Sequence, residues 1–161
     1  MKHDSYDASC SICEASAGDV SIPGEVIWED KHWFVRHLPS SEAAVAGWLL
    51  FCTHRHVQGP AHFNDEEATA FGPVLRHISR TLEDVTGAPR VYLVAFGESY
   101  PHMHAHLIPR YSDLSPEYTA FGVADLARAV KSGAEPGVSE EDVLAVTAKL
   151  QEALKADPPP S

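Results

Sequence analysis

The sequence predicts an α+β fold with a mainly antiparallel sheet. Short apolar segments with strand-like patterns occupy much of the first two thirds of the chain, and one long segment with helical spacing of apolar residues interrupts them. The last two strand-like segments are joined by a short turn, and such turns pair neighbouring strands antiparallel. Strands interleaved with one long helix, without regular strand–helix alternation, favour the α+β class over a parallel sheet.

Strand signals occur at four places before the most distinctive segment of the chain. Gly47–Cys52 is a continuous apolar run, typical of a strand buried on both faces, and Cys52 within it is predicted to be a small core residue. The other three segments are Val26–Trp28, His32–Leu38 and Val91–Phe96.

The long helix is predicted from its start signal. Asn64 is a capping residue, Glu67 completes a capping box, and Gly87 is a stop signal. Between them, apolar residues at helical spacing indicate a helix face that packs on the core. This face is formed by Phe71, Val74, Leu75, Ile78 and Leu82.

The C-terminal third carries weaker patterns. A short helix is predicted over 124–131, and Ser139 is a second capping signal, followed by an amphipathic helix through 143–154 that we expect to pack on the domain. Residues 1–9 are polar and are predicted to be loose, 16–24 are predicted to form a loop, and 157–160 a frayed tail.

Composition limits the function classes. A chain of 161 residues with 44% apolar residues fits one globular domain over 1–161. The formal net charge of -11 argues against polymeric nucleic acid and anionic membranes as partners, but it leaves room for a small phosphorylated ligand. No apolar run approaches the roughly 20 residues of a membrane span, and the polar N-terminus lacks a signal-peptide core. A cytoplasmic location with reduced thiols is therefore expected.

Three histidines at alternate positions form the most distinctive segment, His102, His104 and His106. On a strand, alternate residues share one face and lie roughly 6.5–7 Å apart. An imidazole can act near neutral pH as nucleophile, acid, base or metal ligand. The row therefore predicts either a metal site or a nucleophile whose neighbours hold the substrate and move protons.

Other residues could supply metal ligands at the same time. Cys10 and Cys13 have the spacing of a metal knuckle, although a redox pair and two unrelated thiols are alternatives. His54 and His56 would face the same way, so either could be a ligand. Two thiols, one of these histidines and one end of the row would form a closed Cys2His2 zinc site, which is structural because no position stays open for water.

Residues His102–Ile108 resemble the signature of the histidine triad (HIT) family: His, apolar, His, apolar, His and two apolar residues. The flanks are also similar, with Glu98–Tyr100 before the signature and Pro109–Arg110 after it. Upstream, residues 26–30 resemble the first strand and turn of the family, and 51–57 resemble its strand followed by a Pro-Lys-x-His segment. Residues 10–13 resemble the N-terminal half-site of the zinc-binding members. The resemblance covers about 10–110, and 111–161 form a C-terminal extension.

The resemblance implies a five-stranded antiparallel sheet, a homodimer, and hydrolysis or transfer at the α-phosphate of a nucleotide. His104 would attack phosphorus and form a nucleotidyl-histidine intermediate. His106 would bind the phosphate oxygens and assist the leaving group. Ser99 would contact the phosphate or the leaving group, and Glu98 occupies a Gln-like position beside it. Implied substrates are dinucleoside polyphosphates and nucleoside phosphoramidates.

The resemblance also implies a structural Zn²⁺ ion bound by Cys10, Cys13, His56 and His102. Two alternatives are a zinc-dependent hydrolase that uses the histidine row as ligands, and a nucleotide-binding module without turnover.

The sequence departs from the family pattern at several places. Leu38 stands where many members have an acid that holds the ribose hydroxyls, and Trp48 where some have a histidine. Thr53–His54 replaces the usual Pro-Lys, and the acid Glu98 is unexpected next to a phosphate site. These departures leave the nucleoside preference open.

Overall fold

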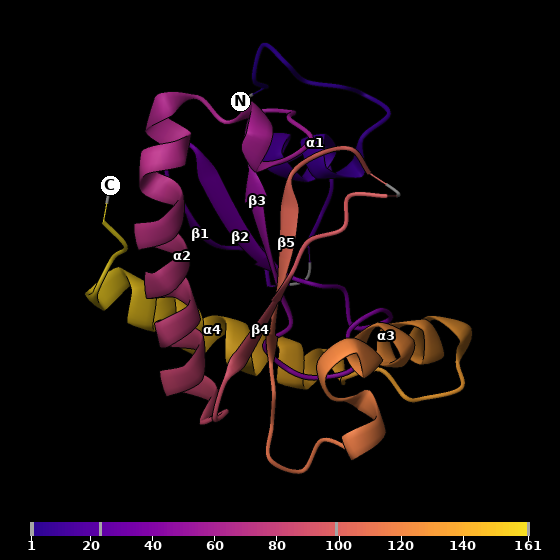
Figure 1. The fold of residues 1–161 in the computed structure, drawn as a ribbon. Helices are drawn as coiled ribbons and strands as arrows, with labels where there is room; N and C mark the ends of the chain where they lie inside the picture. Colours follow the sequence, from indigo (N-terminus) through magenta and orange to yellow (C-terminus); the bar gives the residue numbers. More distant parts are fainter. Residues whose placement is uncertain (1, 23, 99, 161) are drawn as a thin grey trace.

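The computed structural model describes residues 2–22, 24–98 and 100–160 (Figure 1). Its five strands form one sheet in the order β1-β2-β3-β5-β4, and every neighbouring pair is antiparallel. The predicted α+β class and the five-stranded sheet are therefore confirmed. The strands are β1 (Val26–Glu29), β2 (Trp33–His37), β3 (Leu49–Thr53), β4 (Val91–Val94) and β5 (His104–Pro109).

The helices follow the predicted order, with one addition at the N-terminus. They are α1 (Ser11–Ala17), α2 (Asp65–Thr86), α3 (Val123–Ser132) and α4 (Glu140–Ala156), and short 3-10 turns span Pro60–His62, Pro116–Tyr118 and Ala120–Gly122. No helix in the described ranges is long and apolar enough to cross a membrane.

The predicted capping box starts α2. The Asn64 side chain accepts a hydrogen bond from the Glu67 amide at 2.8 Å, and the Glu67 carboxylate accepts one from the Asn64 amide at 2.9 Å. Gly87 closes the helix with φ 68°, a conformation that glycine adopts without strain. The same logic holds for α4, where the Ser139 side chain accepts from the Asp142 amide.

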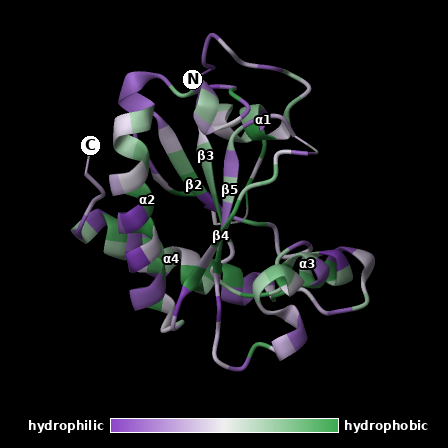
Figure 2. Ribbon diagram, in the orientation of Figure 1, coloured by the Kyte–Doolittle hydropathy of each residue, from purple (hydrophilic) through white to green (hydrophobic). Residues whose placement is uncertain are grey.

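One face of the sheet packs against α2 and α4, which lie together in Figure 1. Figure 2 shows a hydrophilic stretch in the upper part of β5, and α2 mixes hydrophilic and hydrophobic residues as an amphipathic helix does. The predicted packing of the C-terminal helix on the domain is confirmed, because its apolar residues join this core. The core includes Trp33, Val35, Leu49, Phe51, Ala105 and Leu107 of the sheet, Val74, Ile78 and Leu82 of α2, and Val146, Leu150 and Leu154 of α4.

The opposite face of the sheet carries a second apolar cluster. Ile12 from α1 and Val123 from α3 join it, together with Phe34, Leu50 and Ile108 of the strands. Figure 1 shows α1 beside the start of β5 and α3 near its end. The helices therefore flank the outward face of β5 at its two ends.

The helix α1 contradicts the prediction for the N-terminal region. Residues 16–24 were expected to form a loop, but Ser16 and Ala17 belong to α1, which ends at Gly18 with φ 75°. A helix of seven residues is too short to be stable from its own propensity. Burial of Ile12 and Ala15 against the sheet stabilises it, and single-sequence periodicity does not reveal such a contact.

Both chain ends are packed more closely than predicted. The tail was expected to fray, but Pro159 is buried and the Asp157 carbonyl accepts a hydrogen bond from His77 Nε2 at 2.8 Å. Prolines favour an extended conformation in advance, which lowers the entropy lost on packing. At the other end, the Ser5 hydroxyl accepts from the His56 amide at 2.8 Å, so the expectation of a loose N-terminus is wrong there.

Candidate functional site

Two of the three alternate histidines share a face of β5. His104 lies opposite Cys52 of β3, and His106 lies opposite Leu50. Their ring centroids are 5.6 Å apart. His102, predicted to extend the same row, lies in a bend before the strand, which begins only at His104.

Backbone contacts around Met103 account for this correction. The Met103 amide donates to the Val57 carbonyl at 2.6 Å, and the Met103 carbonyl accepts from the Thr53 amide at 3.2 Å. The turn that follows β3 therefore holds this segment, and the regular ladder with β3 begins one residue later.

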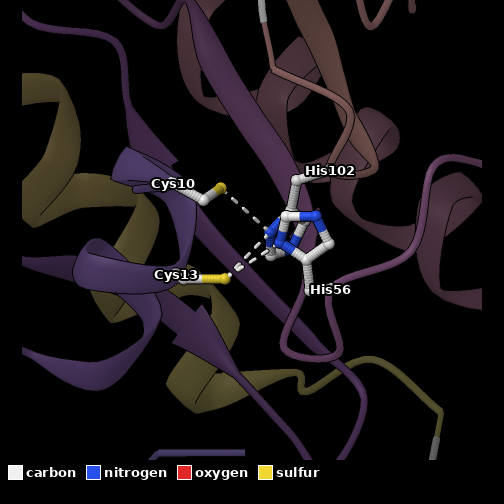
Figure 3. Close-up of side chains that lie close together, drawn as sticks. All are labelled: Cys10, Cys13, His56 and His102. Atoms are coloured by element: carbon white, nitrogen blue, oxygen red, sulfur yellow. Dashed lines mark hydrogen bonds between the residues drawn. The ribbon is translucent and has the colours of Figure 1, made fainter. Parts of the chain in front are cut away.

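His102 instead joins a cluster with Cys10, Cys13 and His56 (Figure 3). The distance from His102 Nδ1 is 3.5 Å to Cys10 Sγ and 3.4 Å to Cys13 Sγ, and His56 Nδ1 lies 3.2 Å from Cys13 Sγ. All four potential ligand atoms lie within 4.8 Å of one another.

Local structure brings these four residues together. The start of α1 places Cys10 and Cys13 one turn apart, the turn after β3 supplies His56, and the bend before β5 supplies His102. His102 is fully buried, and its Nε2 donates to the Thr53 carbonyl at 2.8 Å. This bond leaves the lone pair on Nδ1, which faces the thiols.

The cluster fits a four-coordinate zinc ion. Bond lengths of about 2.3 Å to sulfur and about 2.05 Å to nitrogen give a tetrahedral sulfur–nitrogen edge of about 3.6 Å. The observed edges of 3.2–3.5 Å are close to this value. Burial lowers the pKa of His102 to about 4, so the ring is neutral and able to bind a metal, whereas burial raises the pKa of the Cys13 thiol. The described residues thus contain a possible zinc site.

His54, the other candidate ligand, points elsewhere. Its Nδ1 is 2.8 Å from the Ser16 hydroxyl, and its ring tilts against Phe34. Its Nε2 is 3.8 Å from the Glu29 carboxylate. Of the two histidines after β3, only His56 belongs to the cluster.

The backbone fixes the ring of His104. Its Nδ1 donates to the His102 carbonyl at 2.7 Å, so the lone pair of the neutral ring is on Nε2. A half-buried neutral imidazole with its lone pair on Nε2 can attack an electrophile.

The ring of His106 has the opposite tautomer-defining contact, because its Nδ1 accepts a hydrogen bond where Nδ1 of His104 donates one. Trp48 Nε1, which can only donate, bonds to His106 Nδ1 at 2.9 Å. The neutral ring therefore carries its hydrogen on Nε2. Burial, together with the smaller effects of the nearby His104 and Arg36, lowers the pKa of His106 to about 4. His106 is thus a neutral hydrogen-bond donor at physiological pH.

A cavity of about 230 Å³ opens beside His106. Larger cavities lie away from these histidines, at the start of α2 and between α4 and the segment after β5. We regard the smaller one as part of the candidate site because it contains His106. Its walls come from the sheet, the end of β4 and α3, with Trp48, Val94, Phe96, His106, Ile108, Val123, Ala124, Ala127 and Arg128 as lining residues.

The remaining residues near the expected site make no hydrogen bond with the histidine pair that the structure describes. Glu98 is exposed and has no hydrogen bond or ion pair within the described ranges, and Ser99 lies outside the described residues. Leu38 is buried in the second apolar cluster and therefore offers no polar contact to a sugar. His37 is also buried, with Nδ1 bonded to the Leu38 carbonyl and Nε2 accepting from the Gly47 amide, which makes it a structural residue.

Two residues of this face were missed as site residues. Trp48 contacts His106 directly, and Arg36 lies in the same cross-strand row as His106, with Leu50 between them. Alternation along β2 groups Arg36 with Phe34, but only the strand order relates that face to β5.

Comparisons with known proteins bear on the fold of this chain. No protein-family model matches the sequence. A curated relative, "Protein hit" of Bacillus subtilis (strain 168), is 29% identical over 108 residues, which cover 64% of this chain and 72% of the relative.

Three solved structures are similar in fold. A hypothetical histidine triad nucleotide-binding protein from Sulfolobus tokodaii strain 7 has a TM-score of 0.68 and 15% identity, covering 91% of this chain and 93% of its own. A zinc-bound histidine triad family protein from Mycobacterium smegmatis has a TM-score of 0.65 and 17% identity, covering 92% and 98%. A HIT family hydrolase from Clostridium thermocellum has a TM-score of 0.53 and 18% identity, covering 68% and 96%.

The chain is therefore an α+β protein with a histidine pair on the sheet face opposite α2 and α4, and with a Cys2His2 cluster close to the start of β5. It has the histidine triad fold, and the resemblance noted in the sequence is confirmed at the level of the fold.

Proposed function

We propose that this chain is a histidine triad enzyme that hydrolyses small nucleotides, or transfers their nucleotidyl group, at the α-phosphate. The observation that carries the proposal is the pairing of two oppositely held imidazoles. His104 offers an Nε2 lone pair, and His106 beside it offers an Nε2–H donor. A nucleophile next to a donor is what phosphoryl-type substitution requires.

In the first step, the Nε2 lone pair of His104 forms a bond to the α-phosphorus. The bond from that phosphorus to the leaving group breaks, and its electron pair departs with the leaving group. A neutral imidazole avoids the repulsion that an anionic nucleophile meets at a phosphate. His106 Nε2–H donates to a phosphate oxygen as negative charge develops there.

In the second step, water attacks phosphorus and the bond to His104 breaks. The imidazole recovers its electron pair, and a nucleoside monophosphate and a proton are released. If another acceptor attacks in place of water, the nucleotidyl group is transferred from His104 to that acceptor. Ser99 and Glu98 are proposed to contact the phosphate or the leaving group, as the resemblance implies.

The proposed zinc ligands are Cys10, Cys13, His56 and His102. A zinc ion bound there would supply folding free energy and, with four protein ligands, no open position for chemistry. The His102 carbonyl orients His104. The residue that closes the cluster therefore also positions the proposed nucleophile.

The proposed substrates are dinucleoside polyphosphates or nucleoside phosphoramidates. The family dimer is also part of the proposal. Leu93 supports it, because this residue is 53% exposed on the edge strand β4. Light scattering of the purified protein would test the dimer.

Mass spectrometry after rapid acid-free quenching tests the mechanism. We expect nucleoside monophosphate as product and a nucleotidyl adduct on a peptide that contains His104. A non-catalytic binding module would give neither. A hydrolase that uses the histidine row as metal ligands would instead lose activity on mild chelation while remaining folded, and that result would refute the proposal.

A further inference from the structure

We propose that Trp48 and Arg36 restrict this site to substrates in which the reacting phosphate is joined to a second phosphate, so that the leaving group is a phosphate rather than an amine. The inference rests on the proposed function, because it specifies the substrate class of the same site. Trp48 donates a hydrogen bond to His106, whereas Arg36 lies in the same cross-strand row as His106, and each observation supports the inference independently.

Trp48 removes general-acid chemistry from His106. A histidine that protonates a leaving group must first carry hydrogens on both nitrogens. Here Nδ1 accepts a hydrogen bond from Trp48 Nε1, which has no lone pair to offer in return. Protonation of Nδ1 would place two N–H groups against each other in buried surroundings, since Trp48 is 3% exposed.

This restriction distinguishes the two proposed substrate classes. When a phosphorus–nitrogen bond breaks, the electron pair leaves on nitrogen, and an amine departs readily only if an acid supplies a proton. When the bond to the bridging oxygen of an anhydride breaks, the pair leaves on a phosphate oxygen. A phosphate with a second pKa of about 6 is stable as an anion at neutral pH and needs no acid. The neutral donor His106 therefore suits the anhydride.

Arg36 supplies a positive charge on the same face. Arg36, Leu50 and His106 are direct neighbours across β2, β3 and β5, so all three side chains point to one side of the sheet. Two strand spacings separate the Arg36 and His106 backbones by roughly 10 Å. An arginine and a histidine on one sheet face at that separation are close enough to contact adjacent phosphates of one ligand.

The guanidinium of Arg36 has no partner in the described ranges. Its Nε atom is buried without a hydrogen bond, and no carboxylate pairs with it there. Arg55 shows the contrast, because its Nε and Nη2 both donate to the Glu67 carboxylate, at 2.9 and 2.5 Å. An arginine without a carboxylate partner keeps its positive charge available, and a phosphate close to it would supply the missing charge-assisted hydrogen bond.

The first experiment compares two substrates on the wild-type zinc-loaded protein. The probes are diadenosine tetraphosphate and adenosine 5′-phosphoramidate, and the readout is kcat/KM for release of nucleoside monophosphate. We expect the tetraphosphate to be preferred by at least about 100-fold, because general-acid assistance to an amine is worth about that factor. A phosphoramidate preference would overturn the inference but leave the proposed function intact.

Arg36→Met tests the second-phosphate contact. We expect a loss of about 10- to 100-fold in kcat/KM on the tetraphosphate, the usual value of a hydrogen bond to a charged group. The phosphoramidate rate should change by less than about threefold, and Arg36→Lys should restore part of the loss. Arg80→Met is the matched control, because Arg80 is 75% exposed on α2 and pairs with Asp84. Equal losses on both substrates would contradict the inference.

Trp48→Phe tests the tautomer. The ring remains apolar but the donor disappears, so Nδ1 becomes free to take a proton. We expect faster phosphoramidate cleavage, by about tenfold, increasing as the pH falls toward 4 because burial still lowers the pKa of His106, and a smaller change on the tetraphosphate. Nitrogen NMR of His106 in the wild-type protein provides a measurement that does not depend on the variant folding, and we expect the Nε2–H form from pH 5 to 8.

Binding separates this inference from the proposed function. Titration calorimetry of the wild-type protein with AMP and ADP should show tighter binding of ADP, and Arg36→Met should remove that difference. If neither substrate is turned over but this pattern holds, the proposed enzymatic function fails while the Arg36 contact stands. If ADP binds no better than AMP, or Arg36→Met leaves the difference unchanged, the second-phosphate site is wrong.

Discussion

His102 and His106 are the first and the last of the three alternate histidines. Both rings are buried, but they have different hydrogen-bond partners. Burial lowers the pKa of each ring to about 4. His102 donates through Nε2 to the Thr53 carbonyl and presents the lone pair of Nδ1 to two thiols. His106 accepts at Nδ1 from Trp48, so its hydrogen is on Nε2, and the residue lines the cavity.

The difference shows how identical side chains in one pattern obtain different roles. Burial makes both rings neutral, but the hydrogen-bond partner decides whether a lone pair or a hydrogen faces the functional side. A carbonyl that accepts from Nε2 of His102 leaves a lone pair on Nδ1 that can bind a metal. An indole that donates to Nδ1 of His106 leaves the hydrogen on Nε2, so this ring can donate a hydrogen bond. His104, between them, is held by a carbonyl like His102 but faces outward like His106.

The largest effect should come from the residue between the two ends. His104→Asn removes the proposed nucleophile, so turnover should fall by at least about 1,000-fold. Zinc content and melting temperature should remain close to those of the wild-type protein, because His104 is not part of the Cys2His2 cluster. Nucleoside monophosphate release and thermal unfolding measure the two properties, and full activity in a folded variant would refute the assignment.

The His102 end should control stability. Cys13→Ser removes a ligand of the proposed zinc site, and loss of several kcal/mol of binding free energy should lower the melting temperature by about 10 °C. Zinc per chain should fall together with the melting temperature. Cys52→Ala is the matched control, since Cys52 is also buried but lies outside the cluster. Unchanged metal content in Cys13→Ser would contradict the ligand assignment.

The His106 end should show a pH dependence of its own. The folded pKa of about 4 lies below the normal value of 6.5, so only the unfolded chain gains a proton here between these values. The free energy of unfolding is therefore highest above about pH 6.5 and decreases as the pH falls toward 4, by roughly 1–3 kcal/mol. Burial is the main cause of this shift, and the neighbours His104 and Arg36 contribute less.

Urea unfolding at several pH values measures this contribution. His106→Gln should show a shallower decrease than the wild-type protein over the same range, because glutamine does not titrate. If the free energy of unfolding decreases equally with falling pH in both proteins, His106 does not cause the acid sensitivity.

The smallest effect should lie far from both ends. Asn64→Ala removes a cap of α2 and should cost about 1 kcal/mol of stability. Kinetic constants and zinc content should be unchanged, since α2 packs on the opposite face of the sheet. Thermal unfolding together with a standard activity assay tests this, and an altered KM would show that the two faces are coupled.

Local signals in the sequence predicted much of this fold. The capping box at Asn64 and Glu67, the apolar run of β3 and the second capping signal at Ser139 all depend on neighbours within a few residues. The helix α1 was missed because its stability comes from contacts with the distant sheet. Cross-strand register was equally inaccessible, which is why Arg36 was not recognised as a neighbour of the histidine pair.

The sequence by itself determined the chemical inventory: alternate histidines, a pair of cysteines at metal-binding spacing, and the alternation that puts His104 and His106 on one face. Only the tertiary structure decided how that inventory is divided. Whether a histidine presents a lone pair or a hydrogen depends on partners such as Thr53 and Trp48, which are about fifty residues away in the chain. Hydrogen bonds of such long sequence separation form only when the strands pair, so no local pattern records them.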